Sequence, residues 1–260
     1  FYNMTVNNAN SVYLNTSGDI GGQLTITSGK LYTNNNIVTL SSTGKLVESS
    51  SNKVSGKIRT TRNVVNSGTQ DDNNSFGGLG IIILSSGSQL GNTTVTRTTD
   101  ASIKGNGVDS VYSSIKRYFD VQPTGNSSLN TTVRFKYDAS EISLPNVEND
   151  LHLWSASTLG AAWVDLGGTV TTATKTIEKT GVTSFGIISA SSLPLQPRSA
   201  TVRMWRDKDG IDSTTDDWVQ TNWSLKIKRT STSGATVDSN NSATKVSVDS
   251  LSTNSHFAIV

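Results

Sequence analysis

Residues 23–47 contain the pattern that most constrains the fold, QLTITSGKLYTNNNIVTLSSTGKLV. Short apolar alternations are separated by Ser-Gly, Asn-Asn and Thr-Gly turn signals, which is typical of short β-strands joined by tight turns. Similar units occur at residues 4–6, 12–14 and 53–60. Because the units recur at short spacing, we predict stacked coils of a β-solenoid, or parallel β-helix, in which neighbours bury one another's apolar faces.

The alternation predicts an all-β chain of three parts. Residues 1–109 form the β-solenoid-like region, and residues 110–192 contain cleanly alternating strands that predict an antiparallel β-sandwich. The linker between this sandwich and the last part contains two of the four prolines. Residues 198–260 are a third, small β module, which is short for an independent core and is expected to rest on its neighbour or on a metal ion.

An apolar run at residues 76–84, FGGLGIIIL, predicts a strand that is buried on both faces. Its glycines, Gly77, Gly78 and Gly80, fit neither the dinucleotide-binding spacing nor the phosphate-binding loop. We therefore predict that they allow close backbone packing.

Composition excludes several classes of protein. With 22 basic and 20 acidic side chains the net charge is only +2, so we expect no nucleic-acid partner. The absence of cysteine excludes disulfides, thiol catalysis and cysteine-ligated zinc. No apolar run approaches the roughly 18 residues of a transmembrane helix, so no membrane span is predicted.

The two ends of the sequence suggest a longer polypeptide. The chain begins at Phe1 without a start methionine and ends in the apolar residues 257–260, which resemble a strand cut part-way. We interpret it as a processed or excised piece of a longer polypeptide. Its expected partners are flanking modules of the same polypeptide or, through self-association of exposed strand edges, other copies of the chain.

The first two parts resemble surface and secreted proteins that bacteria export through the type IX secretion system. The resemblance rests on FYNMTVNN and GQLTITSGKLYTNNNIVTL in the first part, and on RYFDVQP, VRFKY and LHLW in the second. It covers roughly residues 1–190 and implies a β-solenoid repeat followed by a β-sandwich at the cell surface.

Residues 198–260 resemble the B-type repeat domains of bacterial surface adhesins, which are immunoglobulin-like or prealbumin-like sandwiches. The motifs are WRDKDGID at 205–212, WSLKI at 223–227 and the closing residues 251–260, where this sequence lacks the glycine that usually precedes the final strand. The resemblance implies that Asp207, Asp209 and Asp212 bind calcium.

The residues themselves give a similar candidate metal site. Five carboxylates surround Gly210, and oxygen ligands of this kind suit Ca²⁺: Asp207, Asp209, Asp212, Asp216 and Asp217. The spacing is not that of an EF-hand, and a solvated acidic turn is the alternative. With the resemblance, calcium is the favoured interpretation.

Tryptophans supply the other candidate binding residues. Trp154 and Trp205 fall on strand faces opposite the expected core and could stack against sugars, whereas Trp163 and Trp223 are expected to pack inside. The two histidines, His152 and His256, are far apart and are interpreted as ordinary strand residues. No nucleophile-elbow motif occurs, and no catalytic residue is predicted.

These observations predict a non-enzymatic, extracellular structural or adhesive segment of a bacterial cell-surface protein, with surface glycans as expected ligands and assembly into a filament as an option. The alternative is a carbohydrate-binding or polysaccharide-degrading β-helix protein. A lyase would need acids and bases converging on one solenoid face, and the first hundred residues offer few acids: Asp19, Glu48, Asp71, Asp72 and Asp100.

Overall fold

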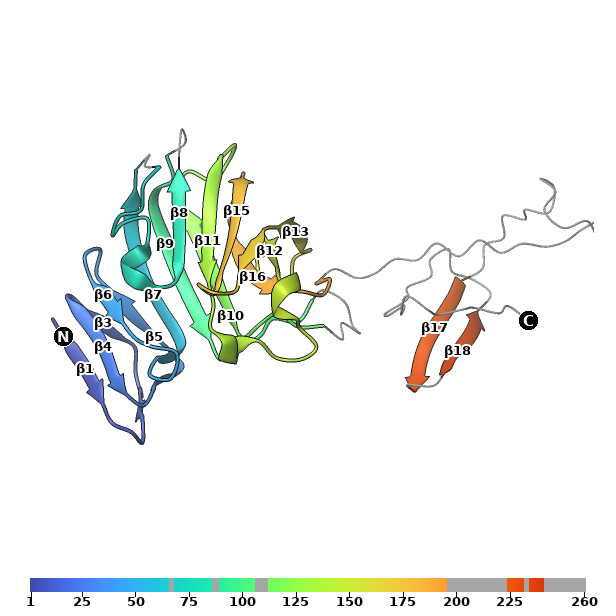
Figure 1. The fold of residues 1–260 in the computed structure, drawn as a ribbon, viewed down its shortest axis with the longest axis horizontal. Helices are drawn as coiled ribbons and strands as arrows, with labels where there is room; N and C mark the ends of the chain where they lie inside the picture. Colours follow the sequence, from blue (N-terminus) through green and yellow to red (C-terminus); the bar gives the residue numbers. More distant parts are fainter. Residues whose placement is uncertain (66–67, 86–88, 106–111, 196–223, 232–233, 241–260) are drawn as a thin grey trace, which may run out of the picture. The chain divides into compact units, whose positions relative to one another are not determined.

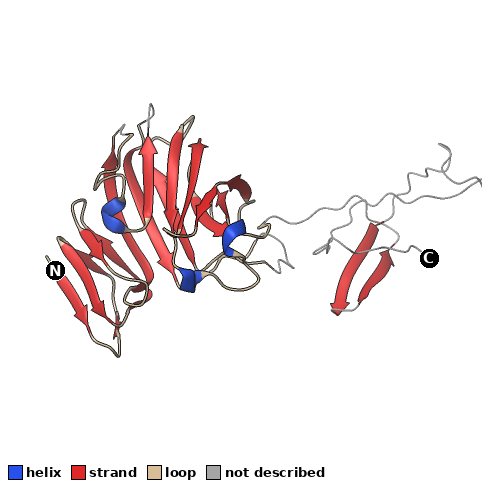
Figure 2. Ribbon diagram, viewed as in Figure 1, coloured by secondary structure: helices blue, strands red, loops and turns tan. Residues whose placement is uncertain are grey.

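The computed structural model describes residues 1–65, 68–85, 89–105, 112–195, 224–231 and 234–240. Strands dominate these residues, and the described helices are three short 3-10 turns (Figure 2). The all-β prediction is therefore confirmed. Residues 1–106 and 112–195 form one compact unit, and the second unit contains an antiparallel hairpin of β17 (Ser224–Ser231) and β18 (Gly234–Asn240).

Parallel pairing characterises the first seven strands. They are β1 (Met4–Asn7), β2 (Val12–Tyr13), β3 (Gly18–Ile20), β4 (Gln23–Ser28), β5 (Leu31–Leu40), β6 (Lys45–Val47) and β7 (Val54–Val64). β1, β4 and β6 form a parallel sheet of their own, while β2 and β3 pair in parallel with β5, which pairs in parallel with β7. The chain thus returns repeatedly to each sheet and adds a new strand parallel to an earlier one.

The register explains why the sequence folds in this way. Leu24 lies opposite both Met4 and Leu46, and Leu31 lies opposite both Val12 and Val54. Apolar side chains of successive turns therefore stack in rows, and Leu24 and Leu31 are fully buried. Burial of these rows stabilises the parallel arrangement.

Every described pairing among β7 and the strands that follow it is antiparallel. The later elements are η1 (Phe76–Gly78), β8 (Ile81–Ser85), β9 (Gly91–Thr99), β10 (Arg117–Pro123), β11 (Thr131–Lys136), η2 (Ala139–Glu141), η3 (Glu148–Asp150), β12 (His152–Ala156), β13 (Val164–Gly167), β14 (Thr169–Thr171), β15 (Thr176–Val182) and β16 (Ile187–Ser191). One sheet has the order β13-β12-β16-β10-β9-β7-β5-β2, with β3 also on β5, and a second has the order β14-β15-β11-β8. Since β7 pairs with β5 on one side and β9 on the other, the parallel and antiparallel regions share a sheet (Figure 1).

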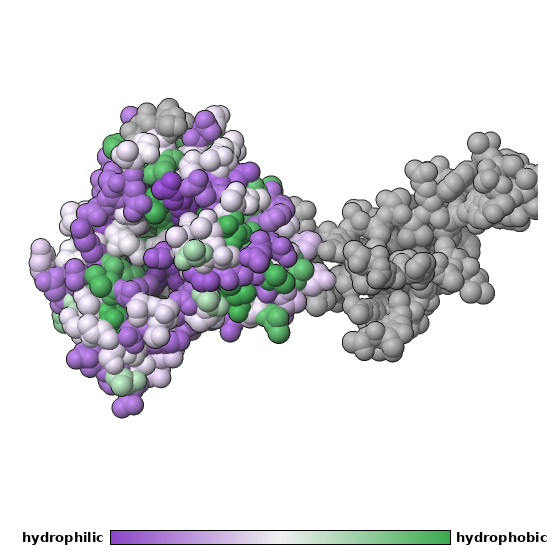
Figure 3. Space-filling view, in the orientation of Figure 1, coloured by the Kyte–Doolittle hydropathy of each residue, from purple (hydrophilic) through white to green (hydrophobic). Residues whose placement is uncertain are grey.

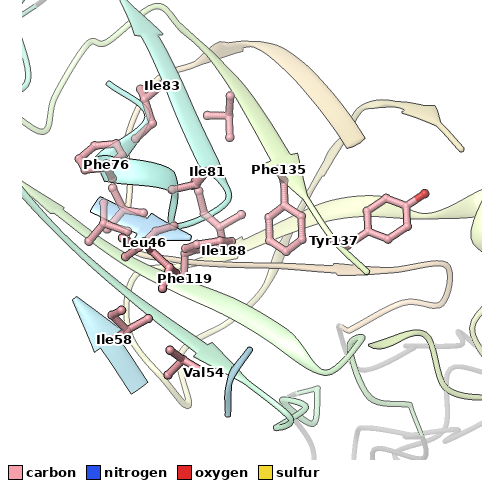
Figure 4. Close-up of a cluster of buried hydrophobic side chains, with 14 of the residues drawn as sticks. Leu46, Val54, Ile58, Phe76, Ile81, Ile83, Phe119, Phe135, Tyr137 and Ile188 are labelled. Carbon is pink, nitrogen blue, oxygen red and sulfur yellow. The ribbon is translucent and has the colours of Figure 1, made fainter. Parts of the chain in front are cut away.

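A continuous apolar core lies between these sheets (Figure 4). Phe119 on β10 meets Phe135 on β11 edge to face, with ring centroids 5.2 Å apart, so the two larger sheets face each other here. Core residues come from both sides of residue 110, and the β9–β10 and β8–β11 pairings also cross that position. The two parts on either side of residue 110 therefore share one core.

The apolar run at residues 76–84 differs from the prediction. It forms the 3-10 turn η1 and then the shorter strand β8, in which Ile81 and Ile83 are buried while Ile82 and Leu84 are only half-buried. The predicted strand with two buried faces is thus wrong. The strand is shorter because Gly77, Gly78 and Gly80 adopt positive φ, which interrupts an extended chain. It is buried on one face because only Ile81 and Ile83 point into the core, as alternate residues of a strand do.

The same glycines confirm the prediction of close backbone packing. A Cβ atom on Gly78 would lie 2.9 Å from the Leu46 carbonyl oxygen, and one on Gly80 would lie 2.7 Å from Nη1 of Arg117. The turn can therefore lie against β6 only because these positions lack side chains.

One face of the described residues is mainly polar at its surface. On the face in Figure 3 hydrophilic and neutral residues dominate, and apolar residues form separate small patches. No helix among the described residues is long and apolar enough to cross a membrane.

Candidate functional site

A polar pocket of about 470 Å³ lies at one end of the larger sheet. Its lining residues are Lys30, Ser50, Ser51, Lys53, Asp100, Lys116 and Ser140. Three ammonium groups and one carboxylate give this lining a net charge of +2, with serine hydroxyls as the remaining polar groups. The pocket therefore offers mainly hydrogen-bond donors and positive charge.

The sheet topology brings the four charged residues together. Lys30 directly precedes β5, Lys53 directly precedes β7, Asp100 directly follows β9, and Lys116 directly precedes β10. In the sheet these strands are neighbours in the order β5, β7, β9, β10 (Figure 1). β5, β7 and β10 run in one direction and β9 runs in the opposite direction. The first residues of β5, β7 and β10 and the last residue of β9 therefore lie at the same end of the sheet.

Asp100 holds two of the lysines in place. Its Oδ2 accepts hydrogen bonds from Nζ of Lys30 at 3.1 Å and from Oγ of Ser55 at 2.7 Å, and its Oδ1 lies 3.6 Å from Nζ of Lys53. Partial burial by itself raises the pKa of Asp100. The bonds from Ser55 and Lys30 and the charge of Lys53 outweigh that effect, so the pKa of this carboxyl group lies below its usual value.

A buried carboxylate, Glu141, lies behind the pocket. Its Oε1 accepts hydrogen bonds from Nη2 of Arg117 at 2.8 Å and from Nζ of Lys53 at 3.3 Å. Oε2 lies 2.8 Å from Nε of Arg117 and accepts a bond from the Asp138 backbone N–H, which completes the capping box of η2. Since Glu141 is fully buried and Lys53 is 3% exposed, both charges depend on these partners.

The loop between β6 and β7, which supplies Ser50 and Ser51, is anchored at both ends. At its start, Glu48 accepts hydrogen bonds from Arg97 on β9 and from the backbone N–H of Val54. At its end, Lys53 binds Asp100 and Glu141. The pocket wall formed by this loop is thus fixed to the antiparallel strands by ion pairs.

The structure places only some of the residues nominated from sequence. Asp207, Asp209, Asp212, Asp216, Asp217 and Trp205 lie outside the described residues. Within the described ranges, no group of three or more His, Asp or Glu side chains is arranged to hold a metal ion.

Trp154 lies in a small buried cluster with Trp163, Ile187 and Leu195. Its ring is only 5% exposed, and its Nε1 donates a hydrogen bond to the Ser191 carbonyl oxygen at 3.1 Å. Trp163 is buried, as predicted for a packing residue. In this cluster both rings contribute to packing.

His152 lies exposed on β12, where its Nδ1 is 3.0 Å from Oδ2 of Asp165 on the neighbouring strand β13. This contact is an ordinary cross-strand pair between two half-exposed side chains.

Sequence reasoning missed the pocket almost entirely. In the sequence Asp100 is one of the few acids of the first hundred residues, and Lys30, Lys53 and Lys116 belong to no motif. The only available signal was position, because each of these residues flanks a strand. Position next to a strand predicts that these residues meet only when the order of strands in the sheet is known.

Comparison with protein-family models, with curated proteins and with solved structures finds no match to this chain. The functional interpretation therefore rests on the residues and their geometry.

Proposed function

We propose that this chain is a non-enzymatic, extracellular structural or adhesive segment of a bacterial cell-surface protein. The observation that carries the proposal is the single core that runs from the parallel-paired residues into the antiparallel sheets. It is reinforced by the ion pair of Glu48 with buried Arg97 and by that of buried Glu141 with Arg117. A segment built in this way suits a load-bearing or ligand-presenting role. The sequence resemblances are what support the proposed bacterial surface location.

Within the all-β class, we propose more specifically that the N-terminal part is a β-solenoid. Successive partners in the rows Met4–Leu24–Leu46 and Val12–Leu31–Val54 are separated by 19 to 23 residues, which supports one coil per repeat. The sandwich modules at 110–192 and 198–260 complete the proposed arrangement.

Association with a flanking module or with another copy is part of the proposal. β1 is the outer strand of its sheet among the described residues, so its outer edge can accept a further strand. Tyr13 stacks on Tyr32 with ring centroids 4.8 Å apart and remains 59% exposed. A further coil could continue this row of rings.

Light scattering of the full chain over a range of concentrations tests self-association. Growth in mass with concentration supports assembly between copies. A chain that stays monomeric at the highest concentration contradicts it and leaves flanking modules of the same polypeptide as the partner.

The second candidate function is carbohydrate binding or polysaccharide degradation, and the lysine-lined pocket favours it because it is polar and of a size typical of small-molecule sites. A glycan array combined with a polysaccharide lyase assay separates the two candidates. Binding without turnover supports an adhesive segment, whereas turnover of any polysaccharide overturns the non-enzymatic proposal.

A further inference from the structure

We infer that the pocket lined by Lys30, Lys53, Asp100 and Lys116 binds a sugar unit that carries a carboxylate, such as a hexuronate. The inference rests on the adhesive side of the proposed function and specifies its ligand. It depends on three features of the pocket, namely its charge, its fixed geometry and its size.

The charge favours an anion. The three lysines outnumber the single carboxylate in the lining, and the nearby charge of Glu141 is matched by Arg117. Lys116 forms no ion pair with any described residue, so its ammonium group is the one left for a ligand. A carboxylate placed beside it would form a charge-assisted hydrogen bond.

The geometry is fixed before a ligand binds. Asp100 holds Lys30 and Lys53 from one side, and Glu141 holds Lys53 from the other. Long lysine side chains normally lose rotamer freedom when they bind a ligand. For Lys30 and Lys53 these contacts already restrict the side chains in the folded chain, which lowers the entropic cost of binding for these two residues.

The size favours a sugar over a simple inorganic ion. A volume of about 470 Å³ would hold on the order of 15 water molecules, so a single oxyanion would fill only a small part of it. Ser50, Ser51 and Ser140 add hydroxyl groups that can donate and accept hydrogen bonds. A ring that carries several hydroxyl groups and one carboxylate matches this combination.

The test is an NMR titration of the isotope-labelled full chain at constant ionic strength with three probes. Sodium galacturonate is expected to bind with a dissociation constant of about 1 mM, as suits a small ligand with one charged anchor. Galactose, which lacks the carboxylate, should bind at least about tenfold more weakly. Sodium sulfate, which lacks the ring, should also bind more weakly than galacturonate.

Variants connect the binding to the pocket. Lys116→Gln should weaken galacturonate binding about fivefold, whereas Lys136→Gln, which removes an exposed lysine of β11 outside the pocket, should leave it unchanged.

Several outcomes would overturn the inference. They are an absence of saturable galacturonate binding, equal binding of galactose or sulfate, and equal loss of binding in the Lys116 and Lys136 variants. If galacturonate fails to bind while the glycan array shows other ligands, the adhesive function stands and only this ligand assignment falls.

Discussion

Arg97 on β9 and Glu48 in the loop between β6 and β7 form an ion pair across the junction of the parallel and antiparallel regions. Nη2 of Arg97 donates to Oε2 of Glu48 at 3.0 Å, and the two side chains are 1% and 14% exposed. The Leu79 carbonyl oxygen accepts a further bond from Nη1 of Arg97 at 3.2 Å. One guanidinium group thus connects three segments that are distant in sequence.

Replacement of Glu48 by Gln should strongly destabilise the fold. The variant leaves the Arg97 charge buried without its counterion, and loss of one partner of a buried pair typically costs about 3–5 kcal/mol. Urea-induced unfolding of the full chain, followed by circular dichroism, measures this change. The matched control is Glu178→Gln, which breaks the exposed pair between Glu178 and Arg134 and should cost no more than about 1 kcal/mol. Equal effects of the two variants would contradict the structural role of the Glu48 pair.

Stability should fall in acid because of the same carboxylate. Burial by itself raises the pKa of Glu48, but the charge and hydrogen bonds of Arg97 and the Val54 N–H together lower it below the usual value. The pKa of Asp100 is lowered as well. A lowered pKa in the folded state means that the stabilisation is complete above the unfolded-state pKa, about 4.3 for Glu and 3.9 for Asp, and is lost as pH falls through the folded-state pKa.

Urea midpoints measured between pH 7 and pH 3 test this expectation. The native chain should lose stability below about pH 4.5, and Glu48→Gln should lose less over the same range because one titrating group is absent. A variant whose pH profile runs parallel to that of the native chain would show that Glu48 is not a source of the acid sensitivity.

The β-rich fold could be predicted from sequence because its signals are local. Alternating residues such as Leu24 and Ile26, followed by turn residues, fix strands without knowledge of distant partners. Within the run at 76–84 only residues 81–84 are in a strand, because Gly77, Gly78 and Gly80 adopt positive φ and interrupt the extended chain that its hydrophobicity predicts.

The pocket could not be predicted because its residues meet through strand order. Lys53 and Asp100 are separated by 47 residues, and they approach only because β7 and β9 are paired. Nor does sequence reveal that Lys53 is buried, since lysine is normally an exposed residue. The acidic loop, by contrast, was visible in sequence but lies outside the described residues.

Calcium should stabilise the C-terminal module if Asp207, Asp209 and Asp212 are its ligands. A ligand that binds only the folded state at about 100 times its dissociation constant adds roughly 2.7 kcal/mol. Differential scanning calorimetry with calcium and then with chelator measures the shift, and Asp209→Asn should abolish it. An unchanged melting temperature in chelator would mean that the loop is a solvated acidic turn.

Gly77 should tolerate no side chain. Its φ of 63° lies in the left-handed region, and a Cβ atom would collide with Nη2 of Arg62 and with the Gly44 carbonyl oxygen. Arg62 is buried and donates to that same oxygen and to the Asp72 carbonyl oxygen at 2.9 Å, so it has little room to move.

Gly77→Ala should therefore cost more than the roughly 1–3 kcal/mol of left-handed strain alone. Gly18→Ala is the control, because a Cβ atom there meets no heavy atom within 4 Å, and it should be neutral or stabilise the chain by up to about 1 kcal/mol. Urea unfolding of both variants measures the difference. If Gly77→Ala were as stable as Gly18→Ala, the turn at η1 would not depend on the close approach of its backbone to Arg62.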